Sequence, residues 1–195
     1  MPNNPRERIV AGAADMLARG GLARTSVREL ARHADTPLGS TYHYFPEGKP
    51  QLAREAVEYA GESISTLLQT ALQDGPDHGL RSLLAVTRTM LIDSEFEAGC
   101  PVFSVAVTES RTGTTRGAVD AAKESFSRWE RALRVSLVEA GVDNDDAEGI
   151  AALTVCSFEG AVGVCRAEGS TRALDTVEDF LTGLITHALP PADRR

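Results

Sequence analysis

Apolar residues recur at intervals of three and four along most of this chain, with polar residues between them. This spacing places the apolar side chains on one face of an α-helix. The long helices predicted in this way span residues 6–19, 50–74, 77–96, 118–140 and 145–167, and a last one begins near 171 and ends before Pro190. A shorter segment, residues 102–110, is apolar on all sides, which indicates a buried helix.

Two short segments near the N-terminus predict a helix-turn-helix. Ser26 and Glu29 have the spacing of a capping box that opens the first helix. Thr36 can cap the second helix, with Pro37 at its first helical position. Only two or three residues separate Ala34 from that start, so the two helices must cross steeply. The second helix carries hydroxyl, imidazole and aromatic side chains, and we expect it to read the major groove of DNA.

Candidate DNA contacts follow from this arrangement. Hydroxyl and cationic side chains at helix N-termini suit phosphates, whereas side chains early in the second helix reach base edges and thymine methyl groups. Tyr42 has an alternative place in the core. The residues that we expect at the DNA are Thr25, Ser26, Arg28, Thr36, Leu38, Ser40, Thr41, Tyr42, His43 and Lys49.

Residues 6–52 resemble the N-terminal domain of the tetracycline-repressor (TetR) family. The resemblance rests on an ordered set of features, namely Ala11, Ala14, Leu17, Gly20-Gly21, residues 25–31 and residues 39–45. The family pattern ends in Tyr-x-x-Phe followed by Lys, here Tyr42, Phe45 and Lys49. The chain departs from the pattern at residues 36–38, where small or basic residues are commoner. Gly48 and the sequence Gly99-Cys100-Pro101 are similar to a branch that regulates drug-efflux and small-molecule metabolism genes.

The resemblance implies an all-α fold with two domains. Residues 1–49 would form a three-helix DNA-binding domain and residues 50–195 a larger helical domain for effector binding and dimerisation. The implied function is that of a homodimeric repressor that binds a palindromic double-stranded operator and is released by a small effector. A constitutive DNA-binding protein without an effector is the alternative. An enzyme is disfavoured because no nucleophile–base or paired-carboxylate set has usable spacing.

The second half of the chain supplies candidates for the dimer interface and the effector site. Small residues in 145–167 allow close approach of another helix, and the last helix carries an apolar seam. The expected interface residues are Ala152, Gly160, Gly163, Val177, Leu181 and Leu184. The family's pocket implies an effector site, for an apolar or aromatic compound, lined by Met90, Phe103, Phe126, Trp129, Phe158 and Glu159. The five apolar members could equally be core residues, and Glu159 could instead face solvent or a second subunit.

Charged residues are distributed unevenly along the chain, which the net charge alone does not show. The net charge of −8 alone argues against a nucleic-acid partner. Residues 1–54, however, hold eight Lys/Arg against five Asp/Glu, a net +3, while the remainder holds 12 against 23, a net −11. A basic N-terminal segment on an acidic body suits contact with phosphates, which supply most non-specific affinity.

The cysteines and histidines offer little further chemistry. Three cysteines without close spacing indicate a reduced, cytosolic protein, and we expect no cofactor. Cys156 and Cys165 lie nine residues apart, on opposite faces of one helix. Cys100 is the one thiol that a helix N-terminus could activate, so a redox sensor is a further alternative. The four histidines lack metal-ligand spacing, and the apolar tract 149–165 falls short of the ~20 residues that span a membrane.

Overall fold

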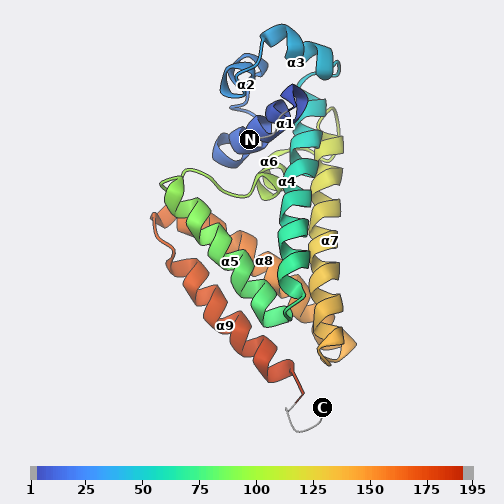
Figure 1. The fold of residues 1–195 in the computed structure, drawn as a ribbon, viewed down its shortest axis with the longest axis vertical. Coiled ribbons are helices and arrows are strands. Elements are labelled where there is room, and N and C mark those ends of the chain that lie inside the picture. The colour runs from blue at the N-terminus through green and yellow to red at the C-terminus, as the bar shows by residue number, and fades with distance from the viewer. Residues whose placement is uncertain (1–3, 191–195) are drawn as a thin grey trace. The chain divides into compact units, whose positions relative to one another are not determined.

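The structure, a computed structural model, describes residues 4–190 and confirms the all-α fold. Within that range it contains helices and no strand (Figure 1). In chain order the helices are α1 (Pro5–Gly20), α2 (Val27–His33), α3 (Leu38–Tyr44), α4 (Lys49–Leu72), α5 (Pro76–Asp93), α6 (Pro101–Thr108), α7 (Arg116–Glu139), α8 (Asn144–Glu168) and α9 (Arg172–Ala188). The predicted helices are therefore present, with ends that shift by one to three residues in most of them.

The chain folds into two compact units. The first unit comprises Met1–Ser63 and Gly99–Ser125, and the second comprises Ile64–Ala98 and Phe126–Arg195. Helices α4 and α7 contribute a first half to one unit and a second half to the other. This division does not coincide with the predicted boundary between residues 49 and 50, because α6 packs against α1 and so joins the N-terminal helices. The functional boundary remains a prediction.

The first unit is built around α1, which contacts α2, α3 and α6. Ile9, Leu17 and Leu30 are at most 1% exposed and form its centre together with Phe45. The predicted capping box is confirmed, since the Glu29 amide donates to Ser26 Oγ at 3.1 Å and α2 begins at Val27. Burial of these apolar side chains, together with the capped start of α2, holds α2 and α3 against α1.

Two local predictions for this unit were wrong. Thr36 does not cap α3: Pro37 takes the N-cap position without a side-chain hydrogen bond, and the Thr36 hydroxyl donates to the carbonyl of Ala31 at the end of α2. The helix α6 is not buried on all sides, since Val102 and Val105 are fully buried whereas Val107 is 62% exposed. The face of α6 that packs against α1 is buried, and the opposite face stays exposed.

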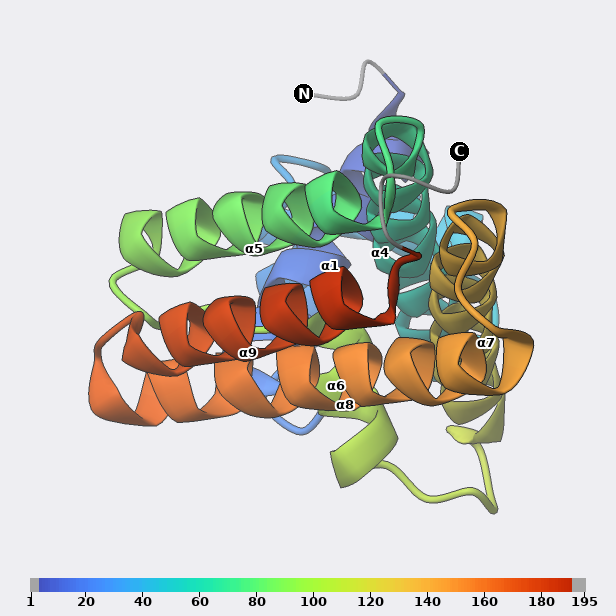
Figure 2. The ribbon, with the colours of Figure 1, turned by 90° about the horizontal axis from the view of Figure 1, so that it is seen from below.

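The second unit contains α5, α8 and α9, which lie side by side (Figure 2). Leu84 of α5, Phe158 of α8 and Leu174, Leu181 and Ile185 of α9 are buried between them. Asp143 caps α8, its carboxylate accepting from the Asp145 amide, and Gly169 ends the helix in the left-handed conformation with φ of 62°. The second halves of α4 and α7 belong to the same unit and are joined by a hydrogen bond of 3.1 Å from Trp129 Nε1 to Ser65 Oγ.

The helix α8 is long and apolar. Among the described residues it is the one helix that by length and apolar content would be able to cross a membrane, and half of the relevant stretch is buried inside the protein. The helix has 25 residues and so extends beyond the apolar tract 149–165 at both ends. Core helices of globular proteins meet the same criterion.

Candidate nucleic-acid interface and neighbouring sites

One face of α3 is left open by the first unit. Tyr42 is 58% exposed and Leu38 37% exposed, and Gly39 and His43 are exposed beside them. Positions 38, 39, 42 and 43 share one side of a helix because residues four apart are neighbours. The alternative place of Tyr42 in the core is thereby excluded. The open face combines an aromatic hydroxyl, an imidazole and an aliphatic side chain, a set that suits phosphate and base-edge contacts.

The structure turns two of the predicted DNA contacts inward. Thr41 is fully buried on the opposite face of α3, one helical turn before Phe45. Thr25 is 7% exposed and its hydroxyl donates to the carbonyl of Gly21 at 2.9 Å. A side chain that packs inside the unit cannot contact DNA. The predicted DNA contacts of Thr25 and Thr41 were therefore wrong, and both side chains have a structural role. Sequence reasoning placed them at the surface because hydroxyls suit either role.

The remaining predicted residues of the N-terminal helices reach the surface to different degrees. Ser26 and Arg28, at the start of α2, are exposed, and the Ser26 hydroxyl also donates to Glu29 Oε2 at 2.7 Å. Thr36 and Ser40 are half-buried on either side of the α3 N-terminus. The role of these four residues at DNA stays a prediction.

Lys49 opens α4 close to this surface. It is half-buried and lines a small cavity together with Thr25 and Val27, which places its aliphatic part against α2. A lysine can bury its stem and still present the ammonium group to solvent. The position at a helix N-terminus adds the positive end of the helix dipole, which favours a phosphate partner.

The structure also shows a positioning network that sequence analysis missed. Arg6 of α1 forms an ion pair of 2.6 Å with Glu55 of α4, and its guanidinium lies 5.2 Å from the centre of the Phe45 ring. Gln51 donates to Glu55 at 3.0 Å and accepts from the Glu47 amide at 3.2 Å. The network therefore ties α1, α4 and the turn after α3 together. Arg6 and Glu55 are 49 residues apart, so no local pattern could have paired them.

The predicted effector-site residues are divided between the two units. Phe103 belongs to the first unit, whereas Met90, Phe126, Trp129, Phe158 and Glu159 belong to the second. The rings of Phe126 and Trp129 contact each other edge to face at 5.4 Å between centres. Glu159 is 2% exposed, so the reading in which it faces solvent was wrong.

Two surface cavities of the second unit lie elsewhere. One of about 400 Å³ lies between α4 and α7, and one of about 570 Å³ lies between the α4–α5 turn and the residues around Gly141 and Leu189. Neither is lined by the six predicted residues. The effector site over those six residues remains a prediction.

The helices α8 and α9 leave an apolar stripe on the surface. Phe180 is 77% exposed and Leu184 38% exposed on α9, and Leu153 and Val164 are 49% and 43% exposed on α8. A Cβ atom at Gly160 or Gly163 would meet no other atom within 4 Å, so packing inside the chain does not require these glycines. The exposed stripe contains the predicted Gly160, Gly163 and Leu184, with Ala152 and Val177 half-buried at its edge.

Leu181 does not belong to this stripe. It is 4% exposed and faces the core of the second unit, whereas its neighbour Phe180 points to the surface. The apolar seam predicted for the last helix combined residues from the buried face of α9 with residues from its exposed face. Residues 173, 177, 180 and 184 also form an apolar face at helical spacing, and nothing in the sequence shows which of the two faces is the outer one.

The thiols and acids offer no further centre within residues 4–190. Cys100 and Cys165 are buried and Cys156 is exposed, in agreement with the opposite faces predicted for the last two. Cys100 Sγ occupies the N-cap of α6 and accepts from the Phe103 amide at 3.5 Å. The described part of the chain has no group of three or more His, Cys, Asp or Glu side chains that would hold a metal ion.

Two short helices in contact, α2 and α3, with one face of α3 left open, are typical of a DNA-binding protein of the helix-turn-helix class. Residues 9–56 match the family described as bacterial regulatory proteins, tetR family, and residues 76–180 match the family described as transcriptional regulator LmrA/YxaF-like, C-terminal domain. The chain belongs to the TetR family of transcriptional regulators. The resemblance inferred from residues 6–52 is thus confirmed, and the C-terminal domain is LmrA/YxaF-like.

Relatives and solved structures cover nearly the whole chain. The HTH-type transcriptional regulator Rv0196 of Mycobacterium tuberculosis is 33% identical over 193 residues, 97% of this chain and 98% of the relative. The HTH-type transcriptional regulator LmrA of Bacillus subtilis is 25% identical over 162 residues, 80% of this chain and 84% of the relative. A TetR transcriptional regulator from Legionella pneumophila superposes with a TM-score of 0.83 at 20% identity, over 97% of this chain and 99% of that one, and shows the same fold.

Proposed function

We propose that this protein is a homodimeric, cytoplasmic repressor that binds a palindromic operator and is released from it by a small apolar effector. The observation that carries the DNA-binding part is the open face of α3, with Tyr42 at its centre and the Lys49 ammonium group at the start of α4. The basic balance of residues 1–54 supports this orientation toward phosphates. In this role the chain is a regulator and has no catalytic task.

The apolar stripe on α8 and α9 supports a two-fold dimer. A face with Phe180 at 77% exposure is costly for a monomer in water, and glycines that nothing inside the chain requires allow another helix to approach. A closed two-fold contact uses the same surface of both copies. Two copies of α3 would then read the two halves of a palindromic site.

The effector part of the proposal rests on the buried aromatic cluster of the second unit. Trp129 and Phe158 are 3% and 4% exposed, and Glu159 next to Phe158 supplies a buried carboxylate. An effector weakens DNA binding only as far as it prefers the released state, with a typical coupling of about 1–3 kcal/mol. A constitutive DNA-binding protein is the second candidate, and it predicts that no ligand of the cluster changes operator affinity.

The decisive experiment replaces Tyr42 and Lys49. We expect Tyr42→Ala and Lys49→Ala each to weaken binding to a duplex that the protein selects from a random DNA pool, measured by fluorescence anisotropy. Because each lost phosphate contact lowers the salt slope by about 0.9, and a dimer carries two copies, Lys49→Ala should lower it by nearly two.

Two exposed residues provide matched controls. Tyr59 on α4 is 41% exposed and Lys123 on α7 is exposed, and neither belongs to the proposed interface. Tyr59→Ala and Lys123→Ala should leave the affinity and the salt slope unchanged. If all four variants bind as the wild type does, the assignment of α3 and Lys49 to DNA is wrong.

A further inference from the structure

We propose that the groove between the second halves of α4 and α7 binds a small amphipathic anion, a molecule with an apolar body and a carboxylate, sulfonate or phosphate head. Both helix halves belong to the second unit and lie side by side there (Figure 1). The groove has a volume of about 400 Å³, within the range of small-molecule sites. Its lining consists of Gln69, Leu72, Gln73, Arg128, Arg131, Ala132, Val135, Ser136 and Glu139.

The lining residues form one continuous face from each helix. On α4 they stand at positions 69, 72 and 73, and on α7 at 128, 131, 132, 135, 136 and 139, spacings that keep side chains on one side of a helix. Leu72, Ala132 and Val135 provide apolar surface in the middle, and Val135 is 44% exposed. Amide, hydroxyl and charged groups surround this apolar patch. The groove is therefore amphipathic, as its ligand would be.

The charges in the groove are separated along α7. Arg128 and Arg131 stand at one end of the lining and Glu139 at the other. The eleven steps from Arg128 to Glu139 correspond to about 16 Å of helix. An anionic head is attracted to the guanidinium end and repelled from Glu139, so the body of the ligand would lie across Leu72 and Val135. A guanidinium offers a planar pair of donors that matches a carboxylate or phosphate.

Arg131 is distinguished from other arginines of the second unit by its environment. Arg81, Arg88 and Arg172 each contact carboxylates at 3.1 Å or less. The exposed Arg131, by contrast, has no hydrogen bond or ion pair with any residue that the structure describes. Beyond residue 54 the chain has a net charge of −11, which repels anions in general. A cationic groove in such a body is a selective place for an anionic ligand.

The test uses anilinonaphthalene sulfonate, an amphipathic anion whose fluorescence rises on binding, and its uncharged analogue N-phenylnaphthylamine. Titrations contain the full-length protein and no DNA, so the result does not depend on the proposed repressor function. We expect Arg131→Gln to lower affinity for the sulfonate about tenfold, since a charge-assisted hydrogen bond is lost, and to leave affinity for the neutral analogue unchanged. Val135→Glu should weaken sulfonate binding further, whereas Val135→Lys should retain it.

Arg134→Gln is the matched control. Arg134 lies on the same helix outside the groove, and its guanidinium donates to Asn144 Oδ1 at 2.8 Å. This variant should bind both probes as the wild type does, with an unchanged circular dichroism spectrum in every variant. The inference is overturned if the wild type does not bind the sulfonate, if Arg131→Gln and Val135→Glu bind it normally, or if Arg131→Gln loses both probes equally.

Discussion

The Thr41 side chain packs inside the first unit and does not face the proposed DNA interface. It is fully buried, and its hydroxyl has no hydrogen-bond partner among the described residues. Valine has nearly the same shape without the desolvated hydroxyl. We expect Thr41→Val to raise the free energy of unfolding by up to about 1 kcal/mol, measured by urea denaturation, and to leave operator affinity unchanged.

Thr25→Val is the companion substitution with the opposite sign. The Thr25 hydroxyl donates to the Gly21 carbonyl, so its loss should lower the free energy of unfolding by about 1–3 kcal/mol. A large loss of operator affinity in a stably folded Thr41→Val protein would contradict the structural role and return Thr41 to the DNA interface.

Gly39 tests how closely DNA approaches α3. A Cβ atom at this position would meet nothing within 4 Å, and its backbone lies outside the left-handed region. Alanine is favoured over glycine inside a helix by about 0.5–1 kcal/mol. We expect Gly39→Ala to stabilise the protein in thermal unfolding while weakening operator binding several-fold, because the methyl group would occupy space taken by the DNA.

Gly149 on α8 is the control for this substitution, since it is equally open and lies outside the proposed DNA interface. Gly149→Ala should stabilise to a similar extent without an effect on DNA. Unchanged operator affinity in Gly39→Ala would show that DNA stays at a distance from this residue.

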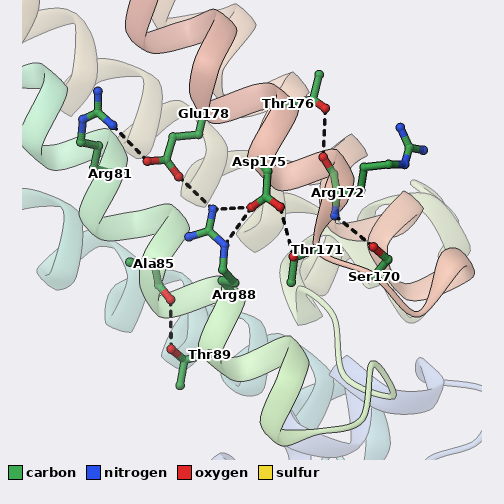
Figure 3. A network of polar contacts seen from close by, with 10 residues as sticks. All are labelled: Arg81, Ala85, Arg88, Thr89, Ser170, Thr171, Arg172, Asp175, Thr176 and Glu178. Carbon is green, nitrogen blue, oxygen red and sulfur yellow. Dashed lines mark hydrogen bonds and ion pairs between the residues drawn. The ribbon is translucent and has the colours of Figure 1, made fainter.

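At the scale of elements, α5 and α9 are joined by an ionic network (Figure 3). Arg88 contacts Asp175 at 2.8 Å and Glu178 at 2.9 Å, and Arg81 contacts Glu178 at 3.1 Å. The hydrogen bond with Glu178, more than that with Asp175, raises the pKa of Arg88 above its ordinary value. Because the pKa of Arg88 is higher in the folded protein than in the unfolded one, the charged side chain stabilises the fold fully at any pH below its unfolded-state pKa. This stabilisation is lost only as the pH rises through the folded-state pKa. The Arg88 contribution is thus constant over the usual pH range.

Salt is therefore the appropriate variable for this network. We expect Glu178→Gln to lower the free energy of unfolding by about 1 kcal/mol at low ionic strength, as partly exposed pairs do. The difference from the wild type should shrink at about 1 M salt, where the Debye length is about 3 Å. Asp77→Asn removes the i,i+4 contact with Arg81 and the negative charge in the first turn of α5, and leaves the contacts between α5 and α9 in place. A salt-independent cost for Glu178→Gln would point to packing rather than charge.

At the scale of the whole molecule, two adjacent residues of α9 separate assembly from folding. Phe180 is 77% exposed and Leu181 4% exposed. If the α8–α9 stripe forms the dimer interface, Phe180→Glu should yield a folded monomer, measured by light scattering at micromolar concentration with circular dichroism as the check on folding. Leu181→Glu should instead unfold the second unit, because it buries an unpaired charge. A Phe180→Glu protein that remains dimeric would place the interface elsewhere.

The sequence by itself determined the elements and the class of protein. Helical periodicity, the Ser26–Glu29 capping box and the breaks at glycine and proline are local signals, and local hydrogen bonding and side-chain spacing largely decide helix formation. The ordered set of features between Arg6 and Leu52 identified the TetR family. These features depend on residues within a few positions of one another.

Only the tertiary structure decided which face of each helix is buried and which distant residues meet. Thr25 and Thr41 are buried, and Leu181 is buried beside an exposed Phe180. Arg6 pairs with Glu55, 49 positions away in the chain. Hydroxyls tolerate core and surface, and an apolar helix such as α8 has no polar face to reveal its orientation. The physical reason is that burial depends on the packing partners of a helix, and those partners come from parts of the chain that no local pattern connects.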